Sequence, residues 1–291
     1  MMDIMKQNIK LICRTWTRCI GIFASILSVI LLFWSLQDMH ISATHDKVIL
    51  IFSLCIIAFV ISIIWVCCLK KSKVIWKNPS GVIKVCYSDI INEGFDEHCK
   101  EKKLIVIPVN TCFDTIVDSD ITAWPAPLVS PNSLHGKWID QMIKKCCSIQ
   151  ELDAKIDESL NKRGEKSTYL YKERGKTQEY KLGTIATIRG NENTTFLLLA
   201  MSRFDEKNVA HTSVDDLQFC IKKLVNFNSD YGQGYKLMIP LMGTNLSRAG
   251  LSHGDSLRII TSLFMIYGDK IHGEVDVVIY EGDRDKVTLD I

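Results

Sequence analysis

Two uncharged apolar runs near the N-terminus constrain this chain more than any other feature of its sequence. They are Cys19–Leu36, with 18 residues, and Val48–Leu69, with 22 residues. At 1.5 Å of rise per helical residue they reach about 27 Å and about 33 Å, close to a hydrocarbon core of about 30 Å. Basic residues precede the first run, as in a signal peptide, but no small-residue cleavage site follows it. We therefore predict a two-helix membrane hairpin.

Basic residues around the two runs predict the orientation of this hairpin. Four Lys/Arg precede the first run and four follow the second, whereas the connecting turn holds only Lys47. The positive-inside rule then places both chain ends in the cytoplasm. Small polar residues recur in both runs and indicate either ordinary helix packing or a pore-lining stripe or oligomer seam: Ser25, Ser28, Ser53 and Ser62.

Charge and cysteine usage exclude several classes of protein. Through Lys77 the chain has nine Lys/Arg against three Asp/Glu, and the remainder has 26 against 30. A slightly acidic remainder argues against a general nucleic-acid binder, which needs a basic face. The 11 cysteines form no C-x-x-C pair and no Cys/His spacing typical of zinc. We expect reduced thiols and no metal.

From Gly81 onward, apolar runs alternate with amphipathic stretches, which predicts an α/β fold around a largely buried sheet. The predicted domains are 1–77, with the membrane hairpin, and 80–291. The expected strands are Val82–Tyr87, Lys103–Val109, Thr184–Arg189, Thr194–Ala200, Leu237–Leu241 and Val275–Tyr280. The expected helices are Gly136–Cys146, Ser148–Asn161, Ser213–Ser229 and Arg248–Lys270. The charged segment 161–181 is predicted as a solvated hairpin excursion or mobile loop.

Three loops follow directly on predicted strands, where α/β sheets build ligand sites. Asp89 and Ile90 follow one strand, and Asn110 and Thr111 follow the next. The third loop, in "KLMIPLMGTNLSRAGLSHGD", is rich in Gly, Thr, Asn and Ser but has no Walker lysine and no G-x-G-x-x-G. Asp89 can also cap a helix, and Asn110 can close a turn.

The ordered set of an Asp-Ile turn, "PVN", "SPNSLHG" and "IPLMGTNLSRAG" resembles a macro domain over residues 80–291. It is more similar still to the divergent macro domain of Thoeris antiphage effectors, in which a two-helix membrane hairpin comes first. The resemblance implies a three-layer α/β/α domain with a mixed central sheet. It also implies an effector in the bacterial inner membrane, as a homo-oligomer in contact with lipids.

The resemblance implies an ADP-ribose-type ligand and a role for each matching position. Asp89 would accept from the adenine amino group, Asn110 would face the distal ribose, and the late loop would wrap the diphosphate with backbone amides. Arg248 could add a charge-assisted bond. The predicted ligand-binding residues are Asp89, Ile90, Asn110, Thr111, Ser133, His135, Gly243, Thr244, Asn245, Leu246, Ser247 and Arg248.

One departure from the family pattern bears on catalysis. The glycine run with which hydrolases of this fold grip the distal ribose is replaced by "SPNSLHGKW". We therefore expect no catalytic residue and no cofactor. The nucleotide would be a messenger, such as an amino-acid conjugate of ADP-ribose, which a partner TIR enzyme makes from NAD.

Two further functions stay open. The domain could be a tethered ADP-ribosyl hydrolase, for which Asp114, Asp118 and His135 are the nearby candidates for activating water. It could also be a tether that binds ADP-ribosylated partners without signalling.

Overall fold

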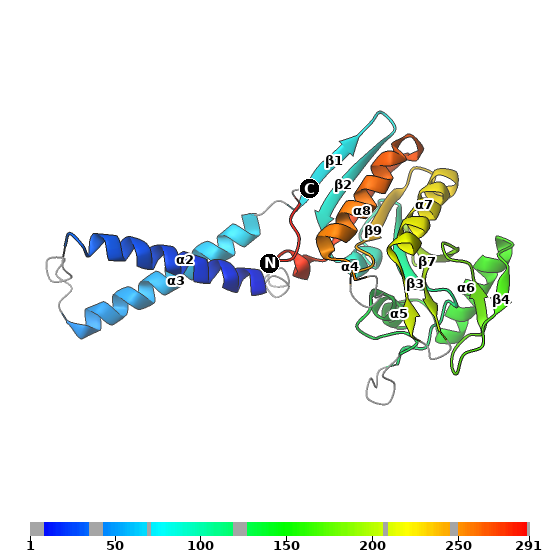
Figure 1. Cartoon of the computed structure of the whole chain (residues 1–291), viewed down its shortest axis with the longest axis horizontal. Helices are drawn as coiled ribbons and strands as arrows, with labels where there is room; N and C mark the ends of the chain where they lie inside the picture. The colour runs from blue at the N-terminus through cyan, green and yellow to red at the C-terminus, as the bar shows by residue number, and fades with distance from the viewer. Residues whose placement is uncertain are drawn as a thin grey trace. The chain divides into compact units, whose positions relative to one another are not determined.

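The computed structural model describes most of the chain (Figure 1), namely residues 9–34, 43–68, 71–118, 127–205, 209–244 and 250–289. Contacts divide the chain into two compact units. One comprises Met1–Lys71 with Glu281–Asp285, and the other Ser72–Tyr280 with Lys286–Ile291.

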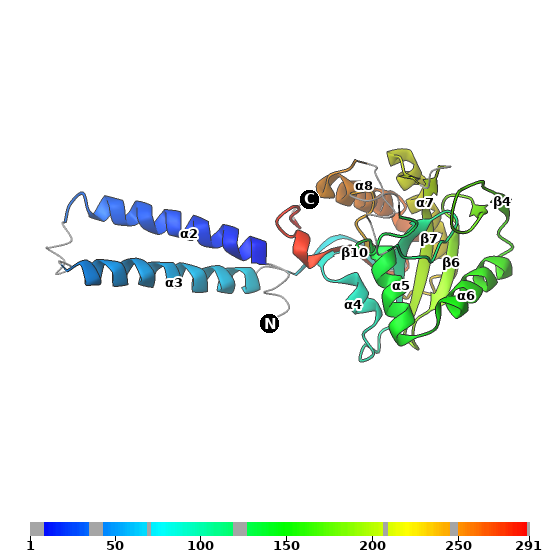
Figure 2. The same ribbon diagram turned by 90° about the horizontal axis from the view of Figure 1, so that it is seen from below.

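The first unit contains two long helices, α2 (Ile9–Ile30) and α3 (Thr44–Cys68), which lie side by side (Figure 2). Trp16 Nε1 donates to the Cys55 carbonyl at 3.0 Å, and the Trp16 ring meets Phe59 edge-on with 5.7 Å between centroids. Both helices are long and apolar enough to cross a membrane. The mean hydropathy is 1.2 over Leu11–Ile30 and 3.0 over Thr44–Val66.

The bounds predicted for the first span were wrong. Helix α2 begins at Ile9, inside the basic stretch, and it ends at Ile30, after which Leu31–Trp34 form a turn. Arginine is a good helix former, so the charged residues do not stop the helix, and Trp16 packs this part of α2 against α3. Helix α3 includes residues 48–68 of the second predicted run.

The second unit is built on an eight-stranded sheet with the order β1-β2-β10-β9-β3-β7-β6, and β8 pairs with β7. Strands β2, β10, β9, β3 and β7 are parallel, whereas β1, β6 and β8 are antiparallel to their neighbours. The sheet is therefore mixed, as expected. The strands are β1 (Ser72–Lys77), β2 (Gly81–Tyr87), β3 (Lys103–Asn110), β6 (Ile185–Arg189), β7 (Thr194–Phe204), β8 (Ala210–His211), β9 (Lys236–Pro240) and β10 (Gly273–Ile279).

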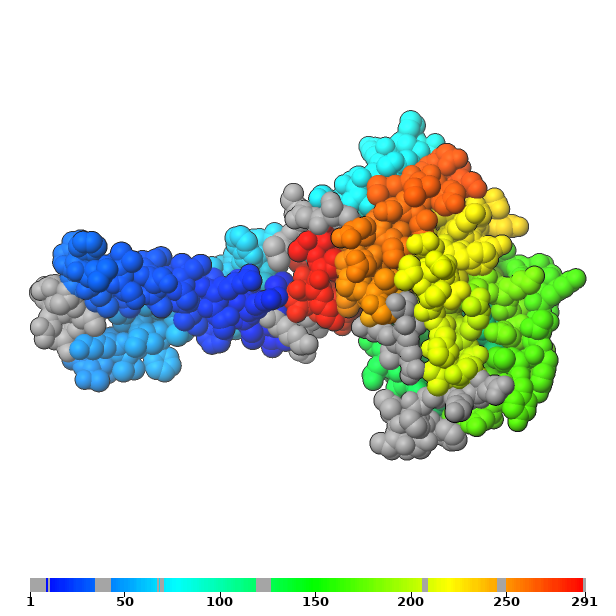
Figure 3. Space-filling model, viewed as in Figure 1, coloured from blue at the N-terminus to red at the C-terminus, as the bar shows by residue number. Residues whose placement is uncertain are grey.

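Successive residues of the central strands supply two separate cores. In β3, Leu104 and Val106 pack in the core covered by α7 (Val214–Tyr231) and α8 (His253–Ile266). Between them, Ile105 packs in the core covered by α5 (Leu134–Lys145) and α6 (Ile149–Lys162). Figure 3 shows α7 and α8, in yellow and orange, covering one face. These three layers confirm the predicted α/β/α architecture.

Several smaller elements complete the unit, and some differ from the prediction. Strand β1 adds Ser72–Lys77 to the sheet, although the predicted domain boundary had left it with the membrane hairpin. Helix α8 begins only at His253, because Ser252 caps it by accepting from the Asp255 N–H at 3.1 Å. The other elements of this unit are α4 (Ile90–Gly94), β4 (Ser167–Tyr169), β5 (Gln178–Tyr180) and the 3-10 turn η1 (Gly268–Lys270). The 3-10 turn η2 (Glu281–Asp283) belongs to the first unit.

Trp138 is the largest fully buried side chain, and it meets Phe196 edge-on with 5.7 Å between ring centroids. We expect Trp138→Ala to lower the free energy of unfolding by about 3–5 kcal/mol, because it removes buried area and leaves a cavity. Urea titration of the full-length chain in detergent measures the change. Tyr169→Ala is the control, since Tyr169 is 76% exposed, and it should change stability little. Equal losses would contradict the packing described here.

Candidate functional site

The carboxyl edge of the parallel strands is the place where the chain leaves the sheet in two directions. After β9 the chain continues to α8 on one face, and after the neighbouring strand β3 it continues to α5 on the opposite face. Ligands of open α/β sheets bind where adjacent strands diverge in this way. The ladder between β3 and β9 also stops at Ile105 and Met238, well before Asn110. The edge between these strands is therefore the candidate site.

Asp89 stands at this edge, directly after β2, and it caps α4. Its Oδ1 atom accepts from the backbone N–H groups of Ile91 at 3.0 Å and Asn92 at 3.3 Å. Among the described residues, Oδ2 has no hydrogen-bond partner. Ile90 is the buried first residue of α4, where the N–H lies outside the helical bonding pattern. Asp89 thus caps a helix with one oxygen, and its other oxygen has no partner among the described residues.

Asn110 ends β3 and organises the turn that follows it. Its Oδ1 atom accepts from the N–H of Cys112 at 3.0 Å and of Asp114 at 3.2 Å. The turn between them includes Phe113 in the left-handed region, with φ of 52°. Thr111 points elsewhere, since its hydroxyl donates to the Glu179 carboxylate at 3.0 Å. The structure therefore leaves Asn110 only its amide donor for a ligand and commits the Thr111 hydroxyl to β5.

The "SPNSLHG" segment forms the start of α5. Ser133 caps the helix by accepting from the Gly136 N–H at 3.0 Å, and it donates to the Ser130 carbonyl at 2.6 Å. A Cβ atom at Gly136 would lie 2.2 Å from that carbonyl oxygen, so only glycine fits. One turn later, the Lys137 ammonium lies 5.8 Å from the centre of the Tyr280 ring, next to the end of β10. The segment therefore lies at the same edge.

His135 is buried in this segment, with its ring stacked on Trp138 at 6.1 Å. Burial, followed by the positive charge of Lys176, lowers the pKa of His135 to about 3. The imidazole is therefore neutral at physiological pH. In the described parts of the chain it has no hydrogen-bond partner. A neutral imidazole can donate one hydrogen bond and accept another, and can in this way read a polar group of a ligand.

The late loop is fixed at the point where it leaves β9. The Ser256 hydroxyl of α8 accepts from the Met242 N–H at 3.1 Å and donates to the Met242 carbonyl at 2.6 Å. Gly243 follows with φ of 82°, which favours glycine, and Thr244 is half-buried. The remaining predicted contacts of this loop lie outside the described residues: Asn245, Leu246, Ser247 and Arg248.

A buried charge network, which the sequence did not predict, fastens the β4–β5 hairpin to the loop after β3. Lys172 and Asp114 form an ion pair at 2.6 Å with both side chains fully buried. The Asp114 Oδ1 atom also accepts from the Lys176 N–H at 2.7 Å. A Cβ atom at Gly175, whose φ is 86°, would lie 2.3 Å from the same oxygen. The hairpin was predicted as solvated, and Tyr171 and Glu173 at its tip are exposed, but Lys172 between them is buried in the domain.

A second carboxylate of the β3 loop is paired in the same way. Arg174 donates to both oxygens of Asp118, at 2.7 and 3.2 Å, and the Leu128 N–H donates at 2.8 Å. Burial works against these bonds, but together they hold the pKa of Asp118 below its usual value. Both carboxylates that sequence reasoning considered for catalysis are thus ion-paired.

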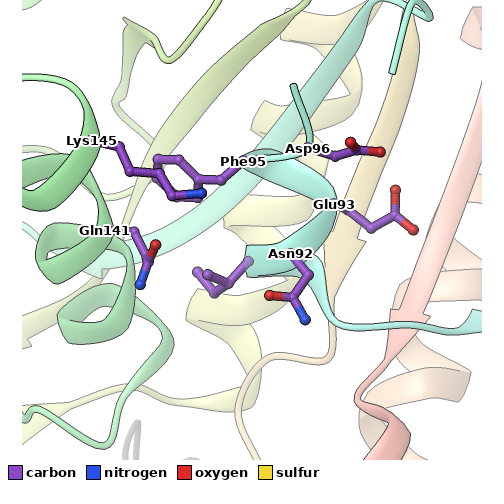
Figure 4. A pocket seen from close by; sticks show the side chains of 7 residues that line it. Asn92, Glu93, Phe95, Asp96, Gln141 and Lys145 are labelled. Carbon is purple, nitrogen blue, oxygen red and sulfur yellow. The ribbon is translucent and has the colours of Figure 1, made fainter. Parts of the chain in front are cut away.

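A pocket of about 380 Å³ lies elsewhere, between α4 and α5 (Figure 4). Gln141 and Lys145 extend into it from α5, and Asn92 and Glu93 from α4. Glu93 is already bonded to Lys103 at 2.7 Å and to Ser88 at 2.9 Å. None of the predicted ligand residues lines this pocket, and we place the candidate site at the strand edge instead.

The family model described as "Thoeris protein ThsA, Macro domain" matches residues 83–280. This stretch runs from β2 to the end of β10 and covers more than half of the 291 residues. The chain belongs to the ThsA macro-domain family. The resemblance predicted from the sequence motifs is therefore confirmed, and the family's matched region includes every predicted ligand residue.

Individual relatives are more distant. Thoeris protein ThsA of Bacillus amyloliquefaciens (strain Y2) is 26% identical over 189 residues, which are 63% of this chain and 59% of that protein. A macrodomain mutant from Oceanobacillus iheyensis is 12% identical, covers 75% of this chain and 93% of its own, and has a TM-score of 0.45. Thermosipho africanus DarTG in complex with ADP-ribose is 13% identical, with 71% and 43% coverage and a TM-score of 0.37. At these values neither structure assigns a residue role here.

The buried His135 makes stability depend on pH. Because its pKa is about 3 in the folded chain and near 6.5 when unfolded, the unfolded chain binds an extra proton between these values. Stability is therefore complete above pH 6.5 and falls as the pH drops towards 3. We expect a loss of about 2 kcal/mol between pH 7 and pH 5 from this residue. The lowered pKa of Asp118 affects stability only below the usual value of 3.8, so this residue does not contribute to the change between pH 7 and pH 5.

Urea titrations of wild type and His135→Asn across this range check the assignment. The His135→Asn chain should lose most of the dependence between pH 7 and pH 5. His211→Asn should keep it, since His211 is 61% exposed. An unchanged slope in His135→Asn would contradict a buried neutral imidazole.

Because Lys172 and Asp114 form a buried pair, we expect the stability changes caused by substituting the two residues to be non-additive. Lys172→Met strands a buried carboxylate and should cost about 3–5 kcal/mol, whereas Lys172→Met with Asp114→Leu should recover most of that loss. Unfolding free energies from urea titration give the coupling. Lys144→Met is the control, because its pair with Asp140 is exposed and should contribute less than about 1 kcal/mol. Additive losses would rule out a coupled buried pair.

Proposed function

We propose that this chain is a membrane-anchored sensor in antiphage defence. Its macro domain binds an ADP-ribose-type messenger at the carboxyl edge of the sheet. Binding makes copies of the chain assemble, and their hairpins then disrupt the bacterial inner membrane. A partner TIR-domain NADase supplies the messenger, and both chain ends face the cytoplasm. The proposal rests on family membership, the geometry of the edge and the two candidate membrane helices.

The observation that carries the proposal is the fixed start of the late loop. Ser256 holds both backbone groups of Met242, and the Gly243 carbonyl accepts from the Leu251 N–H at 3.3 Å. The two ends of the loop, which is rich in Gly, Thr, Asn and Ser, are therefore tied together next to α8. At its glycines no side chain keeps the backbone N–H groups away from a diphosphate. Holding an anion in this way needs no lysine.

His135 supports recognition at the far end of the ligand. The ring is neutral, buried and without a hydrogen-bond partner in the described parts of the chain, so a polar ligand group would satisfy it. Hydrolases of this fold have a glycine run at this position. An imidazole on a capped helix instead suits a messenger with a polar group on its distal ribose, such as a histidine conjugate of ADP-ribose.

The charge network argues against hydrolysis. Asp114 and Asp118 are ion-paired with Lys172 and Arg174, so neither carboxylate is free to take a proton from water. The pKa of His135, at about 3, makes its imidazole a weak base at neutral pH. A site with these groups holds its ligand and does not cleave it.

Signalling requires that the messenger bind the assembled form better than the resting form. A ligand with equal affinity for both shifts nothing, and a change from 1% to 99% assembled needs a preference of about 10⁴-fold. The loops at the carboxyl edge are held by a few hydrogen bonds. When a ligand orders these loops, they can change the contacts between copies of the chain. Assembly is therefore the step through which binding reaches the membrane.

A matched pair of glycine variants tests the ligand site. Gly243→Ala and Gly234→Ala both place alanine at a positive φ, 82° and 72°, but Gly234 precedes β9 at the opposite edge of the sheet. The strain of about 1–2 kcal/mol should weaken binding of ADP-ribose to Gly243→Ala by about tenfold and leave Gly234→Ala unaffected. Calorimetric titration of the full-length chain in detergent measures the affinities, with ADP-ribose and its histidine conjugate as probes.

Dye release from liposomes that contain the full-length chain tests the output. We expect release to depend on the nucleotide and to be reduced in Gly243→Ala at the same nucleotide concentration. Nucleotide binding without dye release would indicate that the protein is a tether. Turnover of an ADP-ribosyl ester would indicate that it is a hydrolase. Equal affinity losses in both glycine variants would place the ligand elsewhere.

A further inference from the structure

Helix α2 has a polar stripe on the side that faces away from α3. Its members recur every three or four residues and therefore share one face. All of them are exposed: Arg14, Thr17, Arg18, Gly21, Ser25 and Ser28. The opposite face packs on α3 through the buried Ile12 and through Trp16. Helix α2 thus has an α3-facing side and an outward polar side.

The register of the hairpin sets the depth of the two arginines. Trp16 lies between Arg14 and Arg18, and it contacts Cys55 and Phe59, which are in the middle of α3. Residues 48–68 of α3 include no charged side chain. If α3 crosses the membrane, Arg14 and Arg18 therefore lie level with the central part of the hydrocarbon core.

An arginine at this depth cannot face lipid without a large cost. Insertion of Arg at the centre of a membrane helix is unfavourable, and such residues face water or the interior of a bundle. Neither Arg14 nor Arg18 has an ion pair with any described residue. Helix α2 does not lie on the membrane surface either, since it packs along α3 (Figure 2).

We propose that α2 helices from several copies of this chain line a water-filled passage through the membrane, and that Arg14 and Arg18 make it favour anions. This inference rests on the membrane assembly proposed above. Where identical α2 helices meet through these stripes, their arginines repel each other. The stripes therefore face water between the helices and do not pack directly against one another. The hydroxyls of Ser25 and Ser28 donate to the Gly21 and Ala24 carbonyls at 2.9 and 2.8 Å, which leaves their lone pairs for water.

Water access along α2 gives the first test. Gly21→Cys lies on the stripe, where a Cβ atom has open space around it, and Ile22→Cys is its exposed neighbour off the stripe. The full-length variants in liposomes are treated with a charged, membrane-impermeant thiosulfonate, with and without ADP-ribose. Modification is read by tandem mass spectrometry, which assigns the modified residue within the α2 peptide and separates it from the native Cys13 and Cys19 of the same helix. Thiols react as thiolates, which form in water and not in lipid.

We expect at least tenfold faster modification of Gly21→Cys than of Ile22→Cys in one or both conditions. Equal rates at the two positions, or no reaction at Gly21→Cys in either condition, would overturn the proposal. If the chain does not sense ADP-ribose, the nucleotide will not change the modification rates. The difference in rate between the two positions still decides whether α2 faces water.

Ion selectivity gives the second test. Currents across planar bilayers that contain the full-length chain, recorded in a KCl gradient, should show a chloride-to-potassium permeability ratio above one. Arg14→Gln with Arg18→Gln should lower the ratio to one or below. Lys47→Gln, which removes one positive charge from an exposed position at the start of α3, should leave it unchanged. An unchanged ratio in the double arginine variant would overturn the assignment of the arginines to the passage.

Discussion

The central strands are buried on both faces, and the rest of the domain follows from this constraint. In β3, neighbouring residues such as Leu104 and Ile105 enter different cores, so the sheet needs a helical layer on each side. Somewhere in such a sheet, adjacent strands send the chain to opposite faces. Strands β9 and β3 do so, and their outgoing loops part at the carboxyl edge. The candidate ligand site is a consequence of layer packing.

Buried ion pairs fix the position of polar segments that hydrophobic packing alone cannot hold in place. The β4–β5 hairpin buries almost no hydrophobic side chains, yet Lys172 and Asp114 fasten it across the loop after β3. Desolvation makes such a pair a poor source of net stability, but breaking it is costly. Its main effect is to hold one arrangement of the loop. The same network pairs Asp114 with Lys172 and Asp118 with Arg174.

The parts of the fold that sequence reasoning found are those with local signals. Strand runs rich in Val, Ile and Leu were found within a few residues, and so was the helix start at Ser213, whose cap is local in sequence. The start of α8 was predicted at Arg248, but the helix begins at His253 after the Ser252 cap. The packing of segment 161–181 was missed, because charge alone does not reveal a partner 58 residues away. Thr111 was assigned to the ligand from its place after a strand, but its hydroxyl bonds to Glu179.

The sequence by itself determined the two apolar helices, the alternation of strands and helices, and the motifs that mark the family. All of these depend on residues that are close along the chain. Tertiary structure decided the environment of each polar group: that His135 is neutral, that one Asp89 oxygen caps α4, and that Trp16 packs beside the middle of α3. These outcomes depend on burial and on contacts between distant segments. Desolvation and ion pairing, which set charge and access, exist only once the layers are packed.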